Sequence, residues 1–75
     1  MTKLPSVTGE RLIRALKKAG WNVKSRKGGH VKLTKPGVYH FLIVSVHGKS
    51  TLPKGTLSNI IKDAGLTNEE LIELL

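Results

Sequence analysis

The apolar residues of this chain change their spacing twice, from a helical repeat to alternation and back to a helical repeat. The first repeat follows Thr8, a good N-cap, and it ends at Gly20, which is placed to close a helix in the left-handed conformation. Its apolar side chains fall on one stripe, typical of a helix that faces a core: Leu12, Ile13, Leu16 and Ala19. Trp21, just beyond the glycine, is predicted to fold back onto the last turn as part of that core.

Alternation that is typical of strands occupies the middle of the chain. Two sets of residues alternate after the first helix: Trp21, Val23 and Ser25 on one side, and Asn22, Lys24 and Arg26 on the other. The turn at 27–29 is rich in glycine, and the chain returns with Val31 and Leu33 in alternation, so we predict a hairpin. The most apolar run, from Tyr39 to Val46, is predicted to form a third strand that is covered on much of its surface.

A second helical stripe follows a polar loop. It consists of Leu57, Ile60, Ile61 and Ala64. The segment Ala64-Gly65-Leu66 repeats the glycine ending of the first helix, and Thr67 and Glu70 have the spacing of a capping box for a short third helix. The order α-β-β-β-α with a terminal helix predicts an α+β fold in which a three-stranded antiparallel sheet carries its helices on one face. We expect a single domain over residues 1–75.

Positive charge extends along nearly the whole chain. The 13 Lys and Arg residues outnumber the 5 Asp and Glu residues, for a formal net charge of +8. Every cation lies between Lys3 and Lys62, and Glu10 is the only acidic residue in that range. Such a balance favours a polyanion through counterion release, so we expect contact with nucleic acid, with a merely solvated lysine-rich surface as the alternative.

The length of 75 residues and the absence of cysteine mean that the core must suffice without disulfides or a thiolate zinc site. No segment approaches the ~20 apolar residues of a membrane span, and the first residues lack the apolar run of a signal peptide. We therefore expect a cytoplasmic protein with no membrane contact.

One histidine lies among cations at the turn between the first two predicted strands. If Val31 and Leu33 point into the core, the period of two places His30 and Lys32 together on the opposite, accessible face. Gly28-Gly29 forms the turn that positions this histidine. An imidazole has an unperturbed pKa of about 6.5 and exchanges its proton near neutral pH, so His30 is a candidate general base.

RNA carries its own nucleophile, the 2′-hydroxyl, so one base and a few cations suffice to cleave it without a metal or other cofactor. The candidate phosphate-binding residues surround the turn: Lys24, Arg26, Lys27 and Lys32. The alternative is that His30 is only a surface histidine beside a turn. His40 and His47 have no ligand partner at helical spacing, so we interpret both as structural or rim residues and expect no metal site. Asp63 is the only aspartate and is predicted to lie at the end of a helix, which argues against a Ser-His-Asp triad.

In their order and spacing, several short segments of this chain resemble the HicA family of bacterial toxins. They are Ala19-Gly20-Trp21, Gly28-Gly29-His30, Val44-Ser45-Val46-His47, Lys54-Gly55-Thr56-Leu57 and Ala64-Gly65-Leu66. The resemblance covers nearly the whole chain and implies an mRNA interferase with a fold like the double-stranded-RNA-binding domain. It also implies that His30, after the glycine turn, is the catalytic residue and that a HicB-like antitoxin is the protein partner. Family members commonly carry Ser where this chain has Gly29, and Pro where it has Ser45.

Three functions from different classes remain open. The first is a toxin ribonuclease that a cognate antitoxin neutralises. The second is a catalytically inert module that binds A-form RNA by its shape and phosphates. The third is a small basic adaptor for an acidic protein. Cleavage of RNA distinguishes the first from the second, and a salt-sensitive affinity for RNA distinguishes both from the third.

Overall fold

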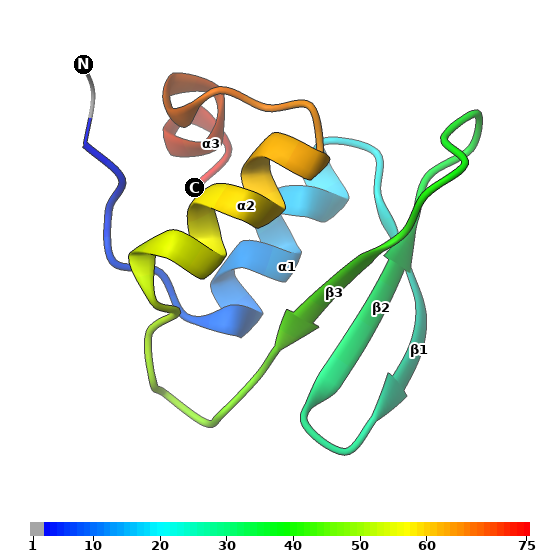
Figure 1. The fold of residues 1–75 in the computed structure, drawn as a ribbon, viewed down its shortest axis with the longest axis horizontal. Helices are drawn as coiled ribbons and strands as arrows, with labels where there is room; N and C mark the ends of the chain where they lie inside the picture. The colour runs from blue at the N-terminus through cyan, green and yellow to red at the C-terminus, as the bar shows by residue number, and fades with distance from the viewer. Residues whose placement is uncertain (1–2) are drawn as a thin grey trace.

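The computed structural model describes residues 3–75 of the chain, within which three helices surround one side of a three-stranded sheet (Figure 1). The elements are α1 (Gly9–Lys18), β1 (Asn22–Lys27), β2 (His30–Thr34), β3 (Leu42–Ser45), α2 (Lys54–Asp63) and α3 (Asn68–Leu74). The predicted α+β order and the likeness to the double-stranded-RNA-binding fold are confirmed. Residues 1 and 2 lie outside the described residues. They belong to the predicted domain and to the first residues, for which the sequence predicts no signal peptide.

The strands follow one another in the order β1-β2-β3, and both neighbouring pairs are antiparallel. Val31 pairs with Val44 and Leu33 with Leu42, and all four side chains are buried beneath the helices. The remaining core residues come mainly from the helices and the segments that flank them: Val7, Leu12, Ile13, Ala15, Leu16, Trp21, Leu52, Leu57, Ile60, Ile61 and Leu71. Among residues 3–75 no charged or polar residue is buried, so the core is wholly apolar.

Local signals begin and end the helices where the sequence predicts. The Thr8 hydroxyl accepts a hydrogen bond from the Arg11 amide at 3.2 Å at the start of α1. Gly20 has φ +99°, a backbone conformation that residues with a side chain rarely adopt, and the buried Trp21 follows it. At the start of α3, Thr67 and Glu70 exchange both hydrogen bonds of a capping box.

The third strand is shorter than predicted. It spans only Leu42–Ser45 and not 39–46, because the turn at Lys35-Pro36-Gly37 is followed by a bend that reaches residue 40. The His40 ring lies 5.9 Å from the Trp21 ring, and its Nε2 lies 2.6 Å from the Asp63 carbonyl oxygen at the end of α2. These contacts hold His40 against the helices and away from the sheet ladder. Much of β3 itself is covered: Leu42 and Val44 are buried and Ser45 is half-buried, while Ile43 is exposed on the uncovered side of the sheet.

A β-bulge interrupts β1. Val23 pairs with Leu33, but the next pair along is Ser25 with Lys32, so Lys24 has no partner in the register. Such a bulge reverses which residues of the bulged strand face each side of the sheet. Arg26 consequently pairs with the buried Val31 and faces the helices. The predicted grouping of Arg26 on the same side as Asn22 and Lys24 is therefore wrong.

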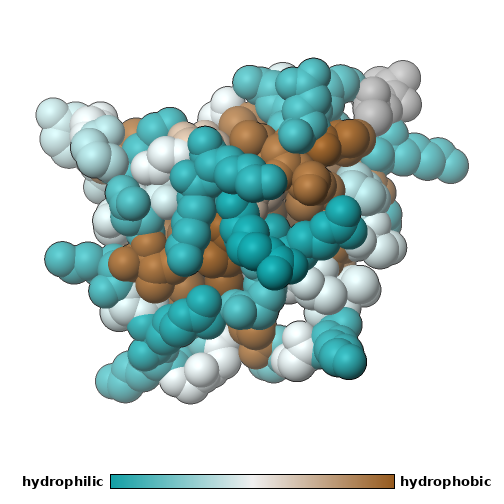
Figure 2. All heavy atoms as spheres, turned by 180° about the vertical axis from the view of Figure 1, so that it is seen from behind, coloured by the Kyte–Doolittle hydropathy of each residue, from teal (hydrophilic) through white to brown (hydrophobic). Residues whose placement is uncertain are grey.

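No helix among residues 3–75 has the length and apolar composition needed to cross a membrane. Seen from behind, the surface is mostly hydrophilic, with hydrophobic areas between the polar side chains (Figure 2).

Candidate active site

The sheet directs His30 away from the helices. His30 is the first residue of β2, and the next residue, Val31, is buried in the core, so alternation turns the imidazole to the uncovered side, where it is exposed. The turn before it contains Gly28, whose φ of +60° is a left-handed conformation that favours glycine. The predicted placement of His30 and Lys32 on one accessible face is thus confirmed by the burial of Val31 and Leu33.

Residues paired across the strands share a face, and the register therefore defines the surroundings of His30. His30 pairs with Lys27 on β1 and with Ser45 on β3, and Lys32 pairs with Ser25 and Ile43. We call this surface the open face; its residues are Ser25, Lys27, His30, Lys32, Phe41, Ile43 and Ser45. It contains one imidazole, two ammonium groups and no carboxylate, which favours the approach of an anion such as a phosphodiester.

Lys32 is held in place by an aromatic ring. Its Nζ lies 4.2 Å from the centroid of Phe41, which is a cation–π contact, and the Lys32 side chain is half-buried between its neighbours. Lys27 has no such support and is exposed at the turn. The two cations therefore differ: the ammonium of Lys32 is partly positioned before any ligand binds, whereas that of Lys27 is free to move.

Two of the predicted phosphate-binding residues are not brought to the open face by the register. Arg26 faces the helices, and its guanidinium donates a hydrogen bond to the Glu10 carboxylate at 3.0 Å. Lys24 occupies the bulge and is exposed. Their assignment as phosphate-binding residues stays a prediction. The sequence indicates the charges correctly but contains no signal for the bulge.

A second histidine, His47, lies close to the glycine turn, and the sequence does not indicate this proximity. The amide of Val46 donates to the Gly29 carbonyl oxygen at 2.6 Å and extends the pairing of β2 with β3 by one position. A Cβ atom at Gly29 would lie 3.6 Å from Cε1 of His47 and 3.1 Å from the Val46 carbonyl oxygen. His47 is exposed here, and its position agrees with its interpretation as a rim residue. Within residues 3–75 no three His, Cys, Asp or Glu side chains are grouped so as to hold a metal ion.

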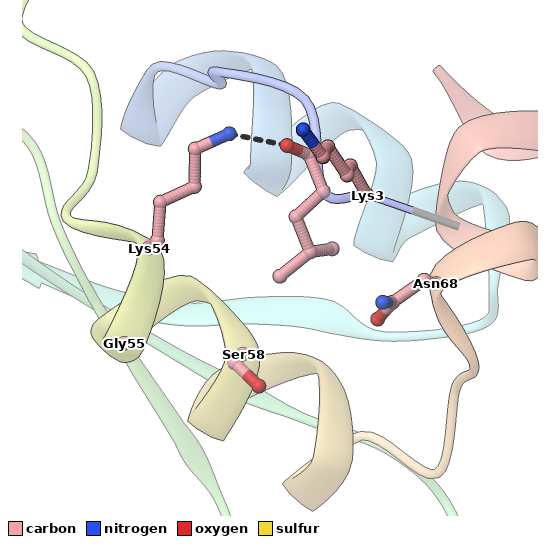
Figure 3. A pocket seen from close by; sticks show the side chains of 6 residues that line it. Lys3, Lys54, Gly55, Ser58 and Asn68 are labelled. Atoms are coloured by element: carbon pink, nitrogen blue, oxygen red, sulfur yellow. Dashed lines mark hydrogen bonds between the residues drawn. The ribbon is translucent and has the colours of Figure 1, made fainter. Parts of the chain in front are cut away.

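A hollow on the helical side of the molecule is a separate feature. It has a volume of about 420 Å³ and lies where the N-terminal segment meets α2 and α3 (Figure 3). Its lining residues are Lys3, Leu4, Lys54, Gly55, Ser58 and Asn68, and the Lys54 ammonium donates to the Leu4 carbonyl oxygen across it. The lining contains no histidine and no acidic residue, so this hollow lacks a general base, and the open face remains the candidate active site.

Comparison with protein families agrees with this assignment of the fold. A family model described as HicA toxin of bacterial toxin-antitoxin matches residues 9–66. The matched range begins at the first residue of α1 and ends just after the glycine that follows α2, so it contains the whole sheet and the open face. No curated protein matches the chain.

Proposed function

The chain belongs to the HicA family of toxins of bacterial toxin–antitoxin systems, and we propose that it is a metal-independent endoribonuclease that cleaves mRNA with His30 as general base. The observation that carries the proposal is the register of the sheet. It pairs the exposed His30 with Lys27 on one side and Ser45 on the other, two residues from Lys32, on a face that has no carboxylate. A general base surrounded by phosphate-binding cations is what cleavage of a phosphodiester by its own 2′-hydroxyl requires.

In the proposed reaction the neutral imidazole of His30 removes the proton of a ribose 2′-hydroxyl. The 2′-oxygen then attacks the adjacent phosphorus, and the bond from phosphorus to the 5′-oxygen breaks. The products are a 2′,3′-cyclic phosphate and a 5′-hydroxyl, whose proton comes from water or from the protonated imidazole. General-base help of this kind contributes about 10²- to 10⁴-fold to the rate.

Lys32 and Lys27 have separate roles in this proposal. The ammonium of Lys32, positioned by Phe41, stabilises the negative charge that develops on the non-bridging oxygens. Lys27, paired with His30 across the β1–β2 ladder, binds the same phosphate. Arg26 and Lys24 bind neighbouring phosphates along the strand. The partners in this proposal are mRNA as substrate and a cognate HicB-like antitoxin, whose acidic surface would complement the net charge of +8.

The test is cleavage of a defined RNA by the purified protein in excess EDTA. We expect cleavage with 2′,3′-cyclic phosphate ends, and His30→Ala should abolish it together with growth inhibition. His40→Ala is the matched control, because it also removes an imidazole but one that lies against α2 and not on the open face. Thermal melts of both variants verify that they are folded.

The outcomes separate the three classes of function. A folded His30→Ala protein that cleaves at the normal rate would exclude His30 as the base, and cleavage that requires a divalent metal would exclude the mechanism. RNA binding without any cleavage would favour the inert RNA-binding module. Affinity for RNA that does not change with salt would remove the electrostatic argument and favour the adaptor.

A further inference from the structure

Two large hydrophobic side chains are exposed on the open face, outside the buried apolar core. Phe41 is 53% exposed and Ile43 is 42% exposed. Ile43 pairs directly with Lys32, and Phe41 lies under the Lys32 ammonium, so both belong to the surface that carries His30. Their exposure has no explanation in the packing of the domain.

The geometry of β3 relates these side chains to the catalytic position. Ser45 is opposite His30, Ile43 is two residues before it, and Phe41 is four residues before it. Since a strand rises about 3.3 Å per residue, the backbone of Ile43 lies about 7 Å along β3 from that of Ser45, and Phe41 lies farther in the same direction, just before β3 begins. Along the open face, the imidazole of His30, the ammonium of Lys32 and the ring of Phe41 therefore follow one another in that order.

We propose that Phe41 and Ile43 form a binding subsite for an unpaired RNA base, next to the phosphate held by Lys32. This inference rests on the proposed function and names the form of RNA that the site accepts: single-stranded RNA, extended along β3. Bases stack on aromatic rings without regard to their sequence, because every base has a π-face. A paired base inside an A-form helix has its faces covered by its neighbours and cannot stack on a protein ring.

The charges of the open face favour RNA over a second copy of this chain as the occupant. A hydrophobic contact with a second copy of this chain would bring Lys27 and Lys32 close to the same cations of that copy, with no carboxylate on the face to compensate them. An RNA strand supplies both complements at once: phosphates for the two lysines and a base for the ring. Single-stranded RNA is therefore the occupant to which the combination of residues is suited.

Binding of a short fluorescein-labelled single-stranded RNA, and of the same sequence as a duplex, tests the proposal. All variants carry His30→Ala so that the RNA stays intact. Phe41→Ala should weaken single-strand binding by about 5- to 140-fold, the range produced by loss of one base–aromatic stack, and should change duplex binding much less. Phe41→Tyr should restore the affinity. With an RNA that carries abasic sites, Phe41→Ala should cause a much smaller loss, limited to the release of the Lys32 ammonium from the ring.

A matched pair of isoleucines controls for the loss of exposed apolar surface. Ile43 on the open face and Ile72 on α3 are 42% and 40% exposed, so Ile43→Ala and Ile72→Ala remove the same group from equally exposed positions. We expect only Ile43→Ala to weaken single-strand binding. A fluorescent base analogue such as 2-aminopurine in the RNA should be quenched on binding by the Phe41 protein and not by its Ala variant.

The outcomes distinguish this subsite from the proposed ribonuclease function. If the wild-type protein cleaves RNA but Phe41→Ala binds single strands as tightly as Ile72→Ala does, the subsite is wrong and the function stands. If stacking is observed but the wild-type protein does not cleave, the function fails and the subsite stands. If Phe41→Ala abolishes self-association or antitoxin binding and leaves RNA affinity unchanged, the face is a protein interface and the proposal is overturned. A protein that binds no RNA at low salt contradicts both.

Discussion

Gly9, the first residue of α1, should be the glycine of this domain that tolerates substitution least. It is buried against the end of β3, and a Cβ atom there would lie 2.6 Å from the Ser45 carbonyl oxygen and 3.2 Å from the Val46 Cα. Both are backbone atoms, so the clash cannot be relieved by a side-chain rotation. The start of α1 or the end of β3 must move, and the latter carries the residue opposite His30.

The expected sign of Gly9→Ala follows from comparing two effects. Alanine is favoured over glycine in a helix by at most about 1 kcal/mol, and less at its first position. Overpacking at a rigid contact typically costs about 1–3 kcal/mol, and here the contact is with backbone. We therefore expect Gly9→Ala to lower the free energy of unfolding by about 1–3 kcal/mol, and each kcal/mol corresponds to a decrease in Tm of about 4–8 °C for a domain of this size.

Gly55 provides the matched control for this substitution. It also lies at the start of a helix, α2, but a Cβ atom there would meet no other atom within 4 Å. Gly55→Ala should therefore raise stability by about 0.4–1 kcal/mol, because it restricts the unfolded chain without a clash. Thermal and urea melts followed by circular dichroism measure both variants. A Gly9→Ala protein that is stabilised as much as Gly55→Ala would refute the close approach of α1 to β3.

Three further predictions concern charge and packing. The affinity of the cleavage-dead His30→Ala protein for single-stranded RNA should fall as salt rises, with a logarithmic slope of about −0.7 per phosphate contact, as measured by fluorescence anisotropy; a flat response would contradict contact with several phosphates. In the same assay Lys32→Ala should weaken binding more than Arg26→Ala, because Arg26 faces the helices and is already paired with Glu10; equal losses would argue against the register. Leu33→Ala should lower stability by about 2–5 kcal/mol in denaturant melts, since it empties a fully buried position, and a loss below that range would argue against its burial.

The helices were predictable from sequence because their signals are local. Thr8, Gly20 and the pair Thr67 and Glu70 act within one turn of the helix that each begins or ends, and the structure uses all of them. The predicted third strand is too long because contacts between residues distant in sequence decide where the strand begins. Its apolar composition predicts a strand from residue 39, but contacts of His40 with Trp21 and with the Asp63 carbonyl decide where the ladder begins, and the Asp63 contact spans 23 positions of the chain.

The candidate site was predictable in part. The alternation of Val31 and Leu33 with His30 and Lys32 needs no knowledge of the neighbouring strands, and it correctly places the imidazole and one cation on the same face. The contact of Phe41 with Lys32 could not be derived in this way. The ring reaches Lys32 because β3 lies beside β2 in one particular register, and a register is a property of two strands together.

The bulge in β1 decides which cation neighbours His30. With regular pairing from Val23 and Leu33 onward, Arg26 would lie opposite His30, and Lys27 would begin the turn. Because Lys24 has no partner in the register, Lys27 pairs with His30 instead. Arg26 then faces the helices, where it forms an ion pair with Glu10. An ammonium on a flexible stem therefore stands beside the imidazole instead of a planar guanidinium. A lysine binds phosphate as a movable point charge, whereas an arginine fixes it in a bidentate geometry, so under the proposed function the bulge gives the phosphate beside His30 a cation that can follow it as the 2′-oxygen attacks.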